Sequence, residues 1–200
     1  MRVATNFISF GEASVNPRLF LLKLKKSLYL CGNLKSNDMS KIYVGLDNGV
    51  SGSIGIVGDD IESVFVKTPV KKVQDYTKAK KEVSRLDYSK FMELFSKYNK
   101  NDITLLMERP LVNPSRFAST ASALRCHEAE LIMIEVMGIR HMFVDSKEWQ
   151  KELLPKGCSG EELKKASLDI GNRLFPQFDN IKHPDRDGIL IAEYARRNHF

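Results

Sequence analysis

The chain has 200 residues, of which 42% are hydrophobic and 28% are charged, so it is long enough for one domain with a full apolar core. It contains no apolar run of the roughly 18 residues that a membrane span requires. Its three cysteines are too few and too scattered for a disulfide framework, and none forms a metal-type Cys-x-x-Cys pair. We therefore expect an intracellular protein with reduced thiols and no membrane association.

The formal net charge of +6 is unevenly distributed along the chain. Residues 1–38 carry six basic and two acidic groups, a net charge of +4, which leaves +2 for residues 39–200. Within that second part, the segment from Lys67 to Arg85 holds seven basic and two acidic residues, so the remainder is net negative. A basic segment of this kind is either a solvated surface loop or a contact for nucleic acid.

The first 38 residues show no clean periodicity, and Met39 stands directly before the first predicted strand. We interpret residues 1–38 as an N-terminal extension, arising from a misassigned start or forming a tail that folds separately, and residues 39–200 as the main domain. Because the extension is poor in acidic residues, an organelle presequence is a further interpretation.

Hydrophobic periodicity predicts a mixed α/β domain. The predicted strands are residues 42–46, 54–57, 61–67, 103–108 and 139–144. The predicted helices are residues 87–98, 115–137, 146–154, 161–175 and 184–197. The first three strands form an antiparallel meander, and the basic segment after them is predicted to be a mobile polar loop. Pro184 is well suited to the first position of the last helix.

Three acidic residues interrupt or end apolar elements. Asp47 follows the first strand, Glu108 ends the fourth, and the apolar stripe of the last helix begins three residues after Asp187. An unpaired buried carboxylate is costly, so we expect these three groups to meet around divalent cations. The alternative is that each acid is an ordinary turn or helix cap.

Oxygen ligands with few histidines favour Mg²⁺, or Mn²⁺ as its substitute, and a pair of such ions suits phosphodiester hydrolysis. A partner for Asp187 is expected just before it in the chain. His183 lies one helical turn earlier and is the favoured candidate. Asp185 is the rival candidate. It is less favoured because, in a continuous helix, it is rotated by roughly 200° from Asp187 and points elsewhere.

Several motifs occur together in residues 41–197. They are Gly45-Leu-Asp47-Asn-Gly49, Leu106-Met-Glu108-Arg-Pro110, Trp149-Gln150-Lys151, Lys164-Lys-Ala-Ser167 followed by Arg173-Leu-Phe-Pro176, and the run His183-Pro-Asp-Arg-Asp187-Gly-Ile-Leu-Ile-Ala-Glu-Tyr-Ala195. In type and order, these motifs resemble the RuvC-type Holliday junction resolvases of the ribonuclease H-like superfamily, particularly those carried by bacteriophages.

This resemblance implies a ribonuclease H-like fold, with a mixed five-stranded sheet flanked by helices, and a structure-specific endonuclease that resolves Holliday junctions in DNA recombination and repair. It implies that Asp47, Glu108 and Asp187 bind two Mg²⁺ ions, with Mn²⁺ as a substitute, and that His183 joins them in catalysis. The chain departs from the family pattern at Pro184, where the fourth ligand is expected. A homodimer in the cytoplasm of a bacterial or phage-infected cell is implied as well.

A branched DNA substrate also fits the basic residues, because cations neutralise phosphates. The candidate DNA contacts are Lys71, Lys72, Lys78, Lys80, Lys81, Arg85, Arg116, Lys164 and Lys165. No base-reading motif is present, so recognition is expected to depend on DNA shape. Two alternatives stay open: a nuclease acting on RNA–DNA hybrids or flaps, and a non-catalytic nucleic-acid-binding scaffold.

Overall fold

The computed structural model describes residues 41–76 and 78–200, so the predicted N-terminal extension lies outside the described residues. The strands are β1 (Ile42–Asp47), β2 (Ser53–Gly58), β3 (Val64–Lys67), β4 (Val70–Gln74), β5 (Glu82–Leu86), β6 (Ile103–Glu108) and β7 (Arg140–Val144). The helices are α2 (Tyr88–Phe95), α3 (Phe117–Met137), α4 (Ser146–Leu153), α5 (Glu161–Leu174) and α6 (Asp187–Arg197), with short 3-10 turns at Lys100–Asp102, Pro114–Arg116 and Pro176–Phe178.

Five strands form one mixed sheet in the order β3-β2-β1-β6-β7, which confirms the predicted fold class. The first three strands pair antiparallel, whereas β6 runs parallel to both β1 and β7. In the parallel pair, Leu46 lies opposite Met107. The next residues along each strand, Asp47 and Glu108, therefore lie at the same edge of the sheet.

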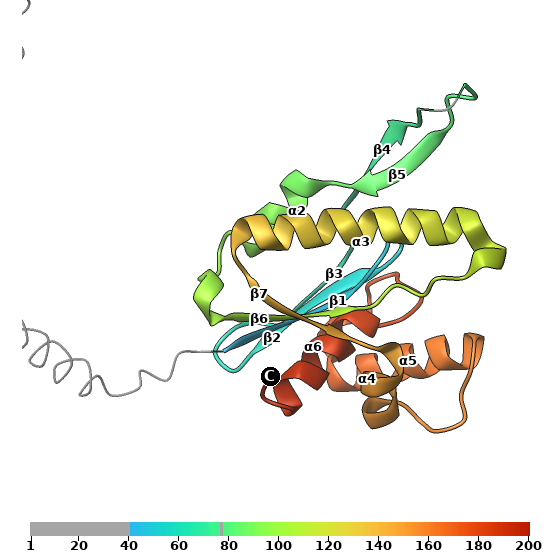
Figure 1. Cartoon of the computed structure of the whole chain (residues 1–200). Coiled ribbons are helices and arrows are strands. Elements are labelled where there is room, and N and C mark those ends of the chain that lie inside the picture. The colour runs from blue at the N-terminus through green and yellow to red at the C-terminus, as the bar shows by residue number, and fades with distance from the viewer. Residues whose placement is uncertain (1–40, 77) are drawn as a thin grey trace, which may run out of the picture. The chain divides into compact units, whose positions relative to one another are not determined.

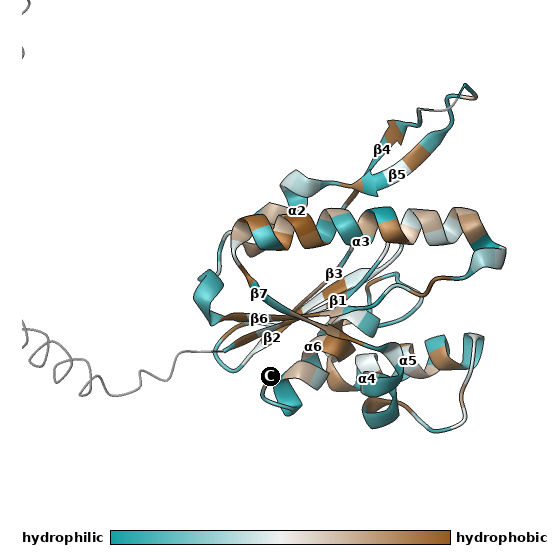
Figure 2. Cartoon of the chain, viewed as in Figure 1, coloured by the Kyte–Doolittle hydropathy of each residue, from teal (hydrophilic) through white to brown (hydrophobic). Residues whose placement is uncertain are grey.

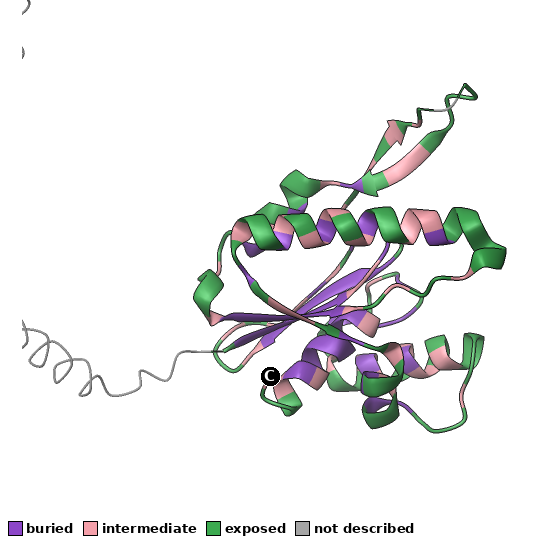
Figure 3. Ribbon diagram, viewed as in Figure 1, coloured by how far each residue is buried: buried purple, intermediate pink, exposed green. Residues whose placement is uncertain are grey.

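Helices cover both faces of this sheet, with α2 and α3 on one side and α4, α5 and α6 on the other (Figure 1). Strand β1 contributes to both cores, since Val44 packs in the core under α3 and Tyr43 packs in the core under α6. The central strands are accordingly buried along most of their length (Figure 3). Mostly apolar segments such as Ile103–Met107 are typical of strands buried on both faces.

Helix α6 lies unusually close to the sheet because two strand positions that face it are glycine. A methyl group on Gly45 would overlap the backbone of Ala192 and Gly188, and one on Gly55 would overlap Ile189. This close packing places the first turn of α6 next to the end of β1, where Asp47 lies.

The basic segment after β3 is not the predicted polar loop but a β-hairpin. Strands β4 and β5 pair antiparallel, with Val70 opposite Leu86, and form a separate two-stranded sheet. Both strands mix hydrophobic with hydrophilic residues (Figure 2). The apolar residues lie three positions apart in each strand, Val70 and Val73 in β4 and Val83 and Leu86 in β5, so the sequence lacks the two-residue period that indicates a strand.

The last helix begins at Asp187, three residues later than predicted. Arg186 is its N-cap residue, and residues 183–186 are not helical. Among residues 41–76 and 78–200, no helix combines the length and apolarity that crossing a membrane would need.

Candidate metal centre

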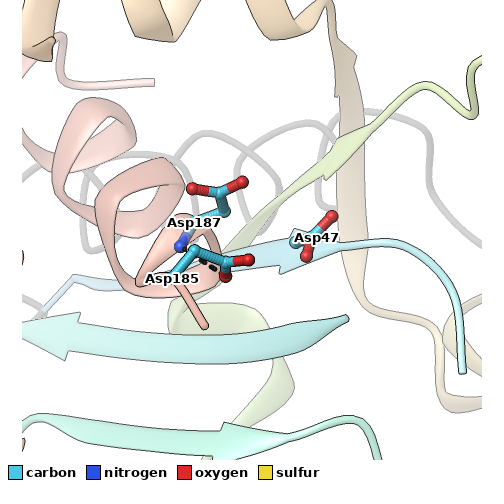
Figure 4. Close-up of side chains that lie close together, drawn as sticks. All are labelled: Asp47, Asp185 and Asp187. Atoms are coloured by element: carbon cyan, nitrogen blue, oxygen red, sulfur yellow. Dashed lines mark hydrogen bonds between the residues drawn. The ribbon is translucent and has the colours of Figure 1, made fainter. Parts of the chain in front are cut away.

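Three aspartates meet at the edge of the sheet where β1 ends. One carboxylate oxygen from each of Asp47, Asp185 and Asp187 lies within 4.8 Å of the others (Figure 4). Asp47 is the last residue of β1, Asp187 is the first residue of α6, and Asp185 belongs to the segment before that helix. Residues 138 positions apart in the chain thus form one acidic cluster.

Asp185 is the residue whose position was predicted wrongly. The expectation that it points away from Asp187 assumed one continuous helix, whereas the backbone before Asp187 is non-helical. There the backbone amide of Asp187 donates a hydrogen bond to Asp185 Oδ1 at 3.4 Å. The geometry therefore includes Asp185 in the acidic cluster.

Glu108 lies beside this cluster at the end of β6. Its Oε1 accepts a hydrogen bond from Ser146 Oγ, and its Oε2 accepts one from Trp149 Nε1 at 3.0 Å. Trp149 is fully buried in the core and also orients this carboxylate. The Asn48 side chain donates to the Glu108 carbonyl at 3.1 Å and so links the ends of β1 and β6.

Burial raises the pKa of three acidic groups of the site, Asp47, Glu108 and Asp187. Burial, followed by the charges of Asp187 and Glu108, raises the pKa of Asp47 well above its ordinary value. Burial and the charge of Asp185 raise the pKa of Asp187 to about 7, although a hydrogen bond from Ser167 opposes them. Burial also raises the pKa of Glu108.

His183 contacts Asp185 rather than offering a free ring nitrogen to the cluster. Its Nδ1 lies 3.1 Å from Asp185 Oδ1, and its Nε2 lies 3.2 Å from the carbonyl of Ser51. Burial lowers the pKa of His183, but the contacts with Asp185 outweigh burial and raise it. His183 thus connects Asp185 with the turn between β1 and β2.

Arg186 and Ser167 are supporting residues that the sequence did not reveal. The fully buried guanidinium of Arg186 donates to the carbonyls of Phe178, Ile181 and Asp185 at 2.9 to 3.1 Å. The hydroxyl of Ser167 donates to Asp187 Oδ1 and accepts the backbone amide of Arg186 at 3.1 Å. Together they fix the segment that carries Asp185 and Asp187.

Comparisons with known proteins show which known structures have a similar fold. No protein-family model and no curated protein matches the chain. A structure search finds RuvC from Thermus thermophilus in complex with a Holliday junction substrate, with a TM-score of 0.52 and 12% identity over 80% of this chain and 94% of that one. The chain has a RuvC-like fold. A second Thermus thermophilus RuvC structure matches with a TM-score of 0.43 and 12% identity over 79% of this chain and 96% of that one.

The donor set of this RuvC-like domain fits a hard divalent cation. All the groups that face one another in the cluster are carboxylate oxygens, which are the ligands of Mg²⁺ and Mn²⁺. In the part of the chain that the structure describes, no lysine or arginine forms an ion pair with Asp47, Glu108 or Asp187. Within the described residues, the ion pair that involves the cluster is that of His183 with Asp185.

The predicted DNA-contacting residues lie on three elements of the RuvC-like domain, outside the carboxylate cluster. Arg116 precedes α3, and Lys164 and Lys165 lie on α5, where Lys164 is 3.9 Å from Glu161. The others belong to the β4–β5 hairpin, namely Lys71, Lys72, Lys78, Lys80, Lys81 and Arg85. Their contact with DNA stays a prediction.

Proposed function

We propose that this protein is a metal-dependent, structure-specific endonuclease that hydrolyses phosphodiester bonds in branched DNA, with the four-way junction as its main substrate. The observation that carries the proposal is the half-buried cluster of Asp47, Asp185 and Asp187, beside Glu108, at one edge of a RuvC-like sheet. The structural relative bound to a Holliday junction supports the choice of substrate. A homodimer, with two sites that cut two strands symmetrically, completes the proposal.

In this proposal, the four carboxylates hold two Mg²⁺ ions, or Mn²⁺ in their place. Bound divalent cations activate water and stabilise the leaving oxygen. Ser146 and Trp149 hold Glu108 in one orientation, while Ser167 holds Asp187. His183 fixes Asp185 through its ring and acts in catalysis as a positioning residue. Preorganisation of this kind keeps the carboxylates in place before substrate arrives.

The basic residues outside the cluster supply the affinity for DNA in this proposal. The β4–β5 hairpin, together with Arg116, Lys164 and Lys165, neutralises phosphates on arms of the substrate that extend from the cleavage site. Affinity should therefore fall as the salt concentration rises, for junctions and for linear duplexes alike.

The central test replaces Asp47 with asparagine. Loss of a group that supports a metal ligand typically lowers metal affinity or activity 10- to 100-fold. Asp47 is a proposed ligand itself, so Asp47→Asn should reduce Mg²⁺-dependent cleavage of a synthetic four-way junction by about 100-fold or more. Junction binding should be unchanged or tighter, since the variant removes negative charge and keeps the basic residues. Cleavage is measured on labelled junctions by gel electrophoresis, and binding by fluorescence anisotropy.

Asp60→Asn is the matched control, because it removes the same charge from an exposed turn. Cleavage by Asp47→Asn at the rate of the Asp60→Asn control would contradict the proposed site. Four-way, flap, RNA–DNA hybrid and linear substrates should be compared side by side with Mg²⁺. Faster cleavage of hybrids would identify a ribonuclease, and binding without cleavage of any substrate would identify a scaffold.

A further inference from the structure

A hollow of about 530 Å³ lies between the β4–β5 hairpin and α3, apart from the carboxylate cluster. One wall is formed by the hairpin and the other by α3, which are neighbours in Figure 1. Val50, in the turn after Asp47, also lines it, so the hollow adjoins the turn that follows the candidate metal site. Its volume falls within the range of pockets that hold small organic ligands.

The rim of the hollow is positively charged. Lys71 and Arg85 line it from the hairpin and Arg125 from α3, and no acidic residue is among its lining residues. Lys71 lies directly opposite Arg85 in the β4–β5 register, and like charges in that position oppose strand pairing. In residues 41–76 and 78–200, none of the three forms an ion pair with an acidic side chain.

The interior of the hollow is apolar, in contrast to its rim. Val73 and Leu86 of the hairpin face Ala129 and Met133 of α3 across it. Single-stranded nucleic acid is bound where cations meet its phosphates and side chains, usually aromatic rings, pack against its bases; Tyr88 is among the lining residues of this hollow. A base in a continuous duplex is stacked and cannot enter, whereas an unpaired base can leave the stack at low cost.

We propose that this hollow binds one unpaired nucleotide of the DNA substrate. The flanking phosphates contact Lys71, Arg85 and Arg125, and the base lies between Val73 and Ala129. The inference rests on the proposed function, since it assumes a DNA substrate. It gives that substrate a further property, which is an unpaired nucleotide close to the branch.

The test measures binding in the Asp47→Asn background, so that cleavage does not interfere. Two dye-labelled duplexes are compared by fluorescence anisotropy, one fully paired and one with a single unpaired thymidine. The unpaired nucleotide should raise the affinity about 10-fold, the effect of one base contact. Ala129→Trp, which fills the hollow without changing its charge, should abolish this preference and keep the affinity for paired duplex.

Arg125→Gln is a second variant for the case in which Ala129→Trp disrupts folding. Arg125 is exposed, so its replacement should leave the fold intact. It should weaken binding of the bulged duplex more than Lys156→Gln, which removes the same charge from the exposed segment between α4 and α5. Thermal melting of each variant verifies the fold.

Equal affinity of the starting protein for both duplexes would overturn the inference, as would a preference that survives in both Ala129→Trp and Arg125→Gln. Dissociation of a dimer by Ala129→Trp, with the preference unchanged, would assign the hollow to a second copy of the chain and also overturn it. The two proposals fail separately. Mg²⁺-dependent junction cleavage without a bulge preference refutes the hollow alone, and a bulge preference without any cleavage refutes the nuclease alone.

Discussion

Arg186 is a charged side chain in the interior whose guanidinium binds backbone carbonyls instead of a carboxylate. It also lies over the ring of Phe65, with 5.0 Å between the guanidinium carbon and the ring centroid. Because three carbonyls of residues 178–185 converge on it, one side chain shapes the segment that brings Asp185 to Asp47. Its planar array of donors suits several acceptors at once, which a lysine ammonium does not.

Arg186→Lys should therefore weaken metal binding even though it retains the positive charge. We expect the affinity for Mn²⁺ to fall about 10- to 100-fold, the usual effect of losing support behind a metal ligand. Isothermal titration calorimetry on the full chain measures this affinity directly, and thermal melting reports the accompanying loss of stability.

Arg140→Lys is the matched control, since Arg140 is exposed on β7. A variant at position 186 that is less stable but binds Mn²⁺ as tightly as this control would limit Arg186 to a structural role.

At the scale of elements, the contact of α6 with β1 and β2 decides where the acidic cluster forms. Gly45→Ala tests this contact, because the added methyl group would overlap the backbone of Ala192 and Gly188. Overpacking of this kind costs about 1–3 kcal/mol, so the free energy of unfolding should fall by that amount. Urea denaturation followed by circular dichroism measures it.

Ser89→Ala on the exposed face of α2 should change the free energy of unfolding by less than about 0.5 kcal/mol. If Gly45→Ala were equally mild, α6 would have room to move away from the sheet, and the position of Asp187 would be less constrained than we infer.

The sheet and most helices could be predicted because the apolar residues of each segment recur with the period of a strand or of a helix. Four of the five residues in Ile103–Met107 are apolar, and α3 ends at Met137 as predicted, with Gly138 at a φ of 67° as its C-cap. The hairpin could not be predicted because the apolar residues of its two strands lie three positions apart instead of two. The start of α6 was placed too early because Pro184 is an equally good residue for the non-helical backbone before a helix.

The candidate site was predictable only in part. Asp47, Glu108 and Asp187 could be named because each interrupts an apolar element, and a sheet with parallel neighbours brings two of them to one edge. The position of Asp185 depends on a backbone bend that no periodicity encodes. Arg186 and Ser167 contact the site through tertiary hydrogen bonds, which leave no signal in the spacing of residues.

At the scale of the whole molecule, the acidic cluster links stability to pH and to metal. The pKa of Asp187, about 7, lies above its ordinary value, so the folded protein keeps protons that the unfolded chain has lost. Without metal, this group makes stability fall as pH rises from about 4 through 7. Cations need the ionised carboxylates, so stabilisation by Mn²⁺ should grow over the same pH range.

Thermal melting with and without Mn²⁺ tests this linkage. At a Mn²⁺ concentration about 100 times its dissociation constant, the melting temperature should rise by on the order of 5–10 °C at pH 8, and much less at pH 5. Asp187→Asn should reduce the increase at pH 8, whereas Asp60→Asn should not. An increase of the same size at both pH values would contradict the linkage.

The base of the β4–β5 hairpin has a consequence for how this domain can change over evolutionary time. The amide of Asp87 donates to the carbonyl of Pro69 at 2.8 Å, so the chain leaves and re-enters the domain at nearly the same point. Leu86, at this base, belongs to one of the two cores, so the part of the hairpin beyond the base can be lengthened, shortened or exchanged without repacking either core. Selectivity for substrates could therefore diversify in this appendage while the chemistry beneath it stays the same.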